Sequence, residues 1–465
     1  MKTSYIKISI YLLLSCFTVL FAKAQMTTRT AYFMENATHS HLMNPALSPY
    51  NGYLSLPAIG SLGLSLESNM AFSQYIYPNE DENGKLPTFM HPDIDAGTFL
   101  SKLSPENYFR FGLRTSILGF GFYTGENFWT FDLAVKANFG MNIPYEFFAF
   151  AKNGMTSGSG NEYHINDFSL DAGAYIEASI GHSRQIFDYL RVGVKLKGLI
   201  GAAYVKANIN EMDIIMSPTR WSVHTNGQLE GYAKGVSFVK DSADAVENFD
   251  LGSPGIGGYG MAVDLGAVYN TPIENLNVSL GIIDLGGINW DKENALLAQA
   301  EGDVDFAGLD GISTDGTSSI DEQVESMKND LMDMISFKEE TVQESYFQRL
   351  SPTINLGVEY SVLNNKISAG VLYSQRLGNG GYSEVMTAIN FRPLKQIQLS
   401  GSYSFVHGAS ETVGFALNLV PYIANIFIAC DYTFLRYTPK YFIPVNTATT
   451  NVQLGVSVPL GKKKI

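Results

Sequence analysis

The chain has 465 residues, of which 16% are charged and 45% hydrophobic, and its formal net charge is −14. A soluble domain is usually about 25% charged, and a polytopic helical membrane protein would be more apolar than this chain. The acidic balance excludes a nucleic-acid binder, which needs a basic surface. Two cysteines in this length exclude a disulfide-stabilised scaffold.

The first 24 residues predict a secretory signal peptide that is removed on export. Lys2 and Lys7 form a basic start, residues 8–21 are apolar, and Ala22-Lys23-Ala24 gives the small-x-small pattern of a cleavage site. The apolar run is too short to span a bilayer. An uncleaved membrane anchor and a lipoprotein acylated at Cys16 are the two alternatives.

Beyond the signal, apolar residues alternate with small or polar ones in stretches of five or more residues. Strict alternation indicates strands with one apolar and one polar face. No run of 18 apolar residues follows the signal, so helical membrane spans are not predicted. The alternating stretches lie at 62–66, 108–115, 128–137, 170–180, 192–204, 261–269, 276–282, 354–360, 367–373, 397–405, 413–419 and 452–460.

Two architectures produce this alternation, a soluble β-sandwich and a transmembrane β-barrel. A sandwich buries the apolar face between two sheets, whereas a barrel turns it to lipid and keeps the polar face inside. Three features favour the barrel: strands of ten or more residues, a second face of Gly, Ser, Asn and Ala, and aromatic residues at strand ends. We therefore predict an all-β, transmembrane antiparallel β-barrel, closed by a strand over 451–460.

The stretch 298–345 breaks the alternation, because it carries 13 acidic residues and only 2 basic ones. Its apolar residues recur at helical spacing, and Ser319 with Glu322 forms a capping-box start. We predict an amphipathic helix over 319–336 in an acidic inter-strand insertion, either docked on the barrel rim or acting as a binding lid. A second helix is predicted over 144–152, at a barrel mouth or at the membrane interface.

The sequence offers little catalytic chemistry, so we expect neither an enzyme nor a cofactor. His39 and His41 are two apart, but two ligands do not make a metal site, and we expect both side chains to be solvated. Asp303, Asp305 and Gly308 fit positions 1, 3 and 6 of a calcium loop, but position 5 is an alanine. Only loose divalent-ion binding remains open there.

The stretch 41–46 (HLMNPA) resembles the N-terminal hatch of outer-membrane barrels related to long-chain fatty-acid transporters (FadL-like barrels). Three further stretches, 54–57 (LSLP), 284–290 (DLGGINW) and 454–461 (LGVSVPLG), resemble a Bacteroidota-type outer-membrane barrel family of unknown function. The resemblance implies a monomeric barrel of about 14 strands (roughly 12–16) with an internal N-terminal plug. It implies no established substrate.

Only Asn44, Pro45 and Ala46 carry over from this resemblance. Pro45 would fix a turn in the plug, and the Asn44 side chain would cap a backbone group inside the lumen. The alternative is an ordinary Asn-Pro turn at the surface.

We therefore expect a signal peptide over 1–24, a plug over 25–58 and a barrel over 59–465 in the cell outer membrane. The expected function is passive transport of small hydrophobic molecules. The alternative is a closed barrel with a structural or interaction role, in surface attachment or as a secretion-system accessory. Expected partners are outer-membrane lipid, lipopolysaccharide and a hydrophobic small molecule, with no nucleic acid and no metal.

Overall fold

The computed structural model describes most of the chain, with gaps at both ends and in several connections. The signal peptide 1–24, Cys16 and the helix expected over 319–336 lie outside the described residues. The described residues are 27–77, 86–154, 161–217, 220–240, 244, 246–306, 337–342, 344–378, 381–394, 396–406, 410–421, 423–432, 436–439, 445 and 448–462.

Strands dominate the described chain, and the helices are short. The helices are η1 (Arg29–Ala31), η2 (Ser40–Leu42), α2 (Phe72–Tyr75), α3 (Ala96–Leu100), α4 (Tyr145–Asn153) and η3 (Lys292–Asn294). The strands are β1 (Asn51–Ser55), β2 (Leu62–Ser68), β3 (Glu106–Thr124), β4 (Asn127–Pro144), β5 (Asn161–Phe187), β6 (Leu190–Met216), β7 (Trp221–Ala233), β8 (Val236–Lys240), β9 (Val246–Leu251), β10 (Gly258–Asn270), β11 (Leu276–Trp290), β12 (Ala295–Phe306), β13 (Lys338–Glu340), β14 (Tyr346–Arg349), β15 (Thr353–Val362), β16 (Ile367–Arg376), β17 (Tyr382–Leu394), β18 (Ile397–Val406), β19 (Ser410–Leu419), β20 (Asn425–Tyr432) and β21 (Ala448–Lys462).

All strands except the β8–β9 hairpin pair antiparallel in one closed ring. β1 and β2 both pair with β21 on one side and with β3 on the other, so together they form one wall strand and close the barrel. In the same way β7 continues into β10, β11 into β12, and β13 through β14 into β15. The ring formed by the described residues therefore has 14 strands, which confirms the predicted number.

The faces of the wall are inverted relative to a soluble protein. On β6 the inward Lys195 and Lys197 are 1% and 5% exposed, whereas the outward Val194 and Leu196 are 37% and 55% exposed. A β-sandwich would bury the apolar face instead. Large apolar side chains that surround a polar interior are typical of a barrel in lipid. The predicted transmembrane barrel is therefore confirmed, and the sandwich is excluded.

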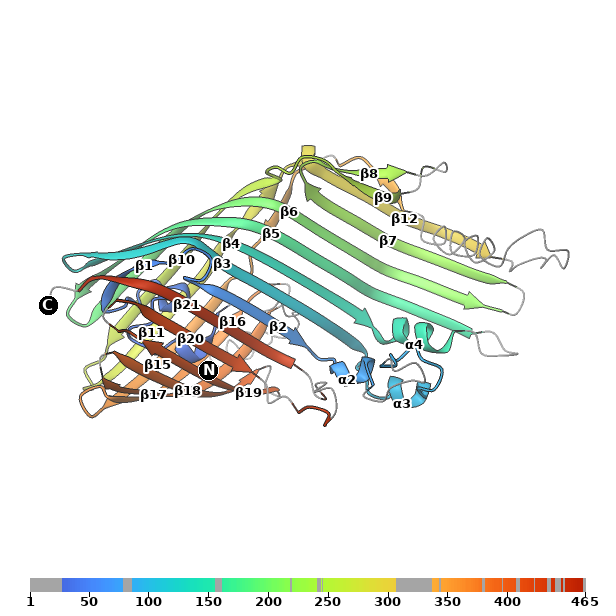
Figure 1. Ribbon diagram of the computed structural model, residues 1–465. Helices are drawn as coiled ribbons and strands as arrows, with labels where there is room; N and C mark the ends of the chain where they lie inside the picture. The colour runs from blue at the N-terminus through green and yellow to red at the C-terminus, as the bar shows by residue number, and fades with distance from the viewer. Residues whose placement is uncertain are drawn as a thin grey trace, which may run out of the picture.

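Part of the wall extends well beyond the membrane. β5 and β6 have 27 residues each, where about 9–11 suffice to cross a bilayer. Toward the end of this extension the polarity reverses: His164 and Asp213 point outward, and the inward side chains join an apolar cluster with α3 and α4. Figure 1 shows β5–β7 and β12 reaching past the other strands, with α2, α3 and α4 near that end. The inward wall residues of this cluster are Ile143, Tyr163, Ile165, Met212, Ile214, Met216 and Val223.

The predicted helix over 144–152 is confirmed as α4, which begins directly after Pro144 and buries Phe148. Within the described residues, no helix is long and apolar enough to cross a membrane. The flanks of the acidic stretch 298–345 belong to the wall, because β12 pairs with both β7 and β13. The wall begins at Asn51 of β1, inside the 25–58 range expected for the plug.

Candidate functional site

Residues 27–50, here called the luminal segment, run inside the barrel before β1 begins (Figure 1). Most of their side chains are buried, although the segment has only two short 3-10 turns. A buried segment with little secondary structure needs partners for its backbone groups. The polar inner face of the wall supplies them.

Arg29 joins the luminal segment to two buried wall carboxylates. Its backbone N–H donates to Asp431 Oδ2 at 2.7 Å, and its guanidinium forms an ion pair with Glu384. The same guanidinium lies 4.3 Å from the centre of the Tyr382 ring. Charges in a low-dielectric interior are tolerated only when they are paired, so Arg29 and Glu384 depend on each other.

Side chains from the wall also satisfy the carbonyl groups of the luminal segment. The donors come from β15, β17, β18 and β19, so these bonds hold the segment across one arc of the ring rather than along one strand. The bonds are Ser400 Oγ to Thr30 O at 2.8 Å, Arg392 Nη2 to Phe33 O at 2.6 Å, Asn418 Nδ2 to Asn36 O at 3.0 Å and Asn355 Nδ2 to Met43 O at 2.9 Å.

The structure places Asn44, Pro45 and Ala46 deep in the lumen, with Asn44 fully buried. Asn44 Oδ1 accepts the backbone N–H of Ala46 at 2.9 Å, while Nδ2 donates to the carbonyl of Ala267 on β10 at 3.3 Å. The side chain therefore closes a local turn and joins it to the wall. The wall residues beside residues 43–46 are the glycines Gly193, Gly266 and Gly281, where a Cβ would overlap with the luminal segment.

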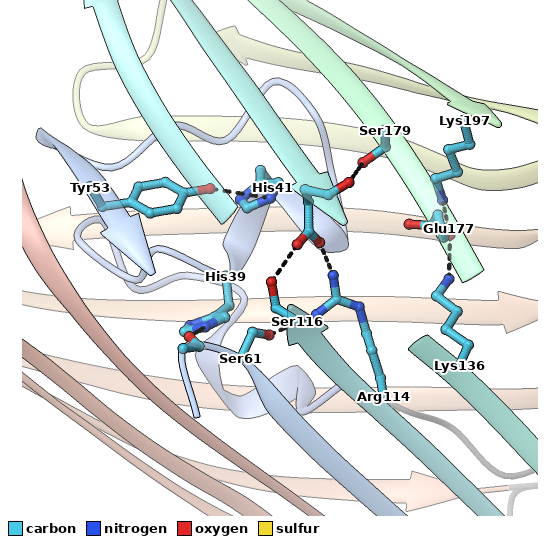
Figure 2. Close-up of polar contacts among 12 residues, drawn as sticks. His39, His41, Tyr53, Ser61, Arg114, Ser116, Lys136, Glu177, Ser179 and Lys197 are labelled. Carbon is cyan, nitrogen blue, oxygen red and sulfur yellow. Dashed lines mark hydrogen bonds and ion pairs between the residues drawn. The ribbon is translucent and has the colours of Figure 1, made fainter. Parts of the chain in front are cut away.

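The expectation that His39 and His41 are solvated is wrong, because both are buried in the lumen. His39 Nε2 donates to the Gly60 carbonyl at 2.8 Å, and Tyr53 Oη lies 3.5 Å from His41 Nε2 (Figure 2). Burial disfavours the charged ring and lowers the pKa of His39 to about 4. Burial also lowers the pKa of His41, and the charge of Lys195 acts in the same direction.

A network of ion pairs occupies the lumen beside the luminal segment. Lys136 Nζ lies 2.7 Å from Glu177 Oε2, and Lys197 Nζ lies 2.7 Å from Asp264 Oδ1 and 2.5 Å from Asp284 Oδ1. In Figure 2, Lys136 and Lys197 approach Glu177 from opposite sides. These residues, with Arg114 and Arg376, line a cavity of only about 120 Å³. The sequence contains one pattern that could have indicated this network: charged residues occur at alternate positions of strands that otherwise have few charges.

A larger cavity of about 930 Å³ lies between the luminal segment and the short turns of the wall. In outer-membrane barrels the short turns face the periplasm, so we call this space the periplasmic cavity. Leu47 and the largely buried Tyr32 and Phe33 of the luminal segment line its apolar part, and amide and charged side chains such as Asn277 and Arg392 add polar groups. Its volume is in the range of small-molecule sites, roughly 300–1,000 Å³.

Fold and site together define an outer-membrane β-barrel whose lumen holds its own N-terminal segment. The chain belongs to a family of unknown function, DUF5723, whose model matches residues 45–431. No curated protein matches the chain in sequence.

Solved structures with a similar fold are outer-membrane barrels. The Pseudomonas putida toluene transporter TodX is 10% identical, with a TM-score of 0.42 over 96% of this chain and 100% of that one. A Pseudomonas aeruginosa FadL homologue is 8% identical, with a TM-score of 0.43 over 95% of this chain and 100% of that one. The translocator domain of the autotransporter NalP from Neisseria meningitidis is 9% identical, with a TM-score of 0.31 over 88% and 89%.

Proposed function

We propose that this protein is a passive outer-membrane channel for small molecules, and that the luminal segment is its plug. The observation that carries this proposal is the position of residues 27–50 across the lumen, between the periplasmic cavity and the ion-pair network. Barrels of 8 strands are filled by their own side chains, whereas those of 16–18 strands leave a water-filled channel. A ring of 14 strands therefore has room for a pore once the segment moves aside.

Many of the contacts that hold the luminal segment are hydrogen bonds whose protein partner water can replace, such as Ser400 to Thr30 and Asn418 to Asn36. The buried Arg29–Glu384 ion pair and apolar packing against the wall add to them. A single hydrogen bond contributes only about 0.5–1.5 kcal/mol net, because water replaces the partner that is lost. The segment can therefore leave the wall without breaking the strand ladder.

We propose small, largely hydrophobic molecules that carry a polar group as the cargo. The periplasmic cavity supports this class, because it combines the apolar surface of Tyr32, Phe33 and Leu47 with amides such as Asn277. The lumen beyond it is lined by Lys136, Glu177 and other charged residues, which disfavours a purely hydrocarbon molecule.

Deletion of residues 28–44 tests the channel proposal. The purified variant should still migrate as a folded barrel in unheated gel electrophoresis and should show at least tenfold more conductance in a planar bilayer than the intact chain. A matched control replaces residues 28–44 with a Gly/Ser linker of equal length, which keeps the chain but removes its wall contacts and should conduct as well. A folded deletion variant that stays silent would contradict the proposal.

One observation favours the second candidate, a closed barrel with a structural or interaction role. The ion-pair network of Lys136, Glu177, Lys197, Asp264 and Asp284 belongs to the wall and remains when the luminal segment is removed. If that network alone blocks passage, the deletion variant is folded and silent, and capture of partners by the acidic flank of β12 becomes the next measurement.

A further inference from the structure

Two histidines and two aspartates form one row across four neighbouring strands of the extension. His164 on β5 lies opposite Asp213 on β6, Asp213 lies opposite His224 on β7, and His224 lies opposite Asp303 on β12. Directly opposite residues of antiparallel strands have Cβ atoms about 4.5–5.5 Å apart. The four side chains therefore share a narrow strip on the outer face of the sheet.

The packing of the inner face fixes the direction of this row. Tyr163, Ile214 and Val223 are sequence neighbours of the row and are buried in the apolar cluster beneath α3 and α4. Since successive side chains of a strand point to opposite faces, His164 and His224 are held on the outside. Their side chains are 60% and 41% exposed, so an ion in solution can reach them.

The ring of His224 is already oriented by Asp303 on the next strand, and the ring of His164 already contacts Asp213, the carboxylate between the two histidines. His164 Nδ1 lies 2.6 Å from Asp213 Oδ1, and His224 Nδ1 lies 2.9 Å from Asp303 Oδ1. A carboxylate that accepts the Nδ1 proton leaves Nε2 with its lone pair. Metal-bound histidines commonly have this arrangement, in which the carboxylate fixes the tautomer and the ring orientation.

We propose that this row is a binding site for a divalent transition-metal ion such as zinc. His164, Asp213 and His224 are the ligands, and Asp303 holds the ring of His224. As the side chains stand, they pair with one another, and no group of three in the described part of the chain converges on a single point. His164 already contacts the Asp213 carboxylate, and His224 lies opposite Asp213 on the next strand. The proposal therefore requires the exposed ring of His224 to turn toward Asp213, and rotations of exposed side chains take picoseconds to nanoseconds.

The chemistry of the row selects the class of ion. Imidazole suits zinc, copper and nickel, whereas calcium and magnesium prefer oxygen ligands alone. The adjacent outward row, formed by Asn166, Glu211, Asn226 and Glu301, adds two carboxylates that favour any cation nearby. The structure therefore assigns Asp303 to a histidine row rather than to the calcium loop considered from the sequence.

The test uses the full-length protein in detergent, purified without a histidine tag, and isothermal titration calorimetry with zinc chloride at pH 7.4. We expect one zinc ion per chain with micromolar affinity. His164→Ala, Asp213→Ala and His224→Ala should each weaken binding at least tenfold. His91→Ala is the matched control, because it removes a histidine that lies 3.7 Å from Asp93 elsewhere on the surface, and it should bind zinc as the intact chain does.

All four variants replace partly exposed side chains, so each should retain the heat-dependent gel shift of a folded barrel. Titration with calcium chloride should give no comparable binding. The proposal is overturned if the intact chain takes up no zinc. It is equally overturned if the three row variants bind zinc as tightly as the intact chain, because the ion would then be held elsewhere.

Discussion

His39 Nε2 donates a 2.8 Å hydrogen bond to the carbonyl oxygen of Gly60, and this bond joins the luminal segment to an interruption in the wall. Gly60 belongs to residues 56–61, which separate β1 from β2 although both pair with the same neighbours. The Gly60 N–H donates to Leu56 O at 2.7 Å, and Val456 N–H on β21 donates to Ile59 O at 3.0 Å. The luminal segment thus contacts the wall where β1 and β2 are interrupted.

This contact predicts that acid releases the luminal segment. The pKa of His39 is lowered to about 4 in the lumen, and that of a released, solvated histidine is about 6.5. Above pH 6.5, His39 contributes fully to holding the luminal segment in the lumen. This contribution weakens as the pH falls toward 4, because the released histidine binds a proton more tightly than the buried one. Arg114 and Lys195 face the two histidines and oppose their protonation. Conductance in planar bilayers should therefore rise between pH 7 and pH 4.5.

The control for the acid response is the double variant His39→Gln and His41→Gln. Glutamine can donate to the Gly60 carbonyl but does not titrate. This variant should conduct equally at both pH values, whereas the intact chain should not. If the conductance of the intact chain does not depend on pH, the two histidines do not control release of the luminal segment.

The wall glycines predict a second way to displace the luminal segment. A Cβ at Gly266 would overlap with Asn44, so Gly266→Val should push residues 43–46 away from β10. We expect several-fold more conductance and faster proteolysis before β1. Gly401→Val is the matched control, because nothing lies within 4 Å of a Cβ at that position. Equal behaviour of the two variants would show that the close approach at Gly266 is unimportant.

Arg29 predicts a loss of stability. Arg29→Ala leaves Glu384 buried without its cation, and breaking a buried ion pair destabilises by about 3–5 kcal/mol. The midpoint of urea unfolding should fall accordingly. Adding Glu384→Gln to Arg29→Ala should restore part of the loss, because the uncompensated charge is gone. A double variant less stable than Arg29→Ala would argue against this pairing.

The sequence predicts the wall better than it predicts the contents of the lumen. Alternation over 192–204 and 397–405 depends on adjacent residues, so it identified β6 and β18 and the polarity of their faces. The burial of His39 depends on β20 and on residues 56–61, because its ring centre lies 4.9 Å from that of Phe427 and its Nε2 donates to the Gly60 carbonyl. No local pattern carries information about such distant partners.

The histidine row shows that the sequence also does not reveal which residues of two paired strands lie opposite each other. His164 lies opposite Asp213 only because the pairing of β5 and β6 shifts near Ala174 and Tyr175. A bulge adds a residue to one strand and changes which residues face each other. The alternation of each strand is visible in the sequence, but the position of the bulge comes from packing between strands.

The periplasmic cavity predicts binding of an apolar probe. Leu47 of the luminal segment lines the cavity, so Leu47→Glu should weaken binding of 1-N-phenylnaphthylamine at least tenfold in detergent-free nanodiscs. Ile423→Glu is the matched control, since this residue is 82% exposed in a short turn and does not line the cavity. Equal affinity in both variants would place the probe outside the cavity.

A reversible tether between the luminal segment and the wall tests the central claim most directly. Thr30 Oγ1 and Ser402 Oγ lie 2.5 Å apart, so cysteines at these two positions, in a Cys430→Ala background, can form a disulfide across that contact. We predict that at pH 4.5 the oxidised protein is silent in a planar bilayer and that a reductant opens it at least tenfold. Equal conductance of the oxidised and reduced protein would contradict the claim that movement of residues 27–50 opens the pore.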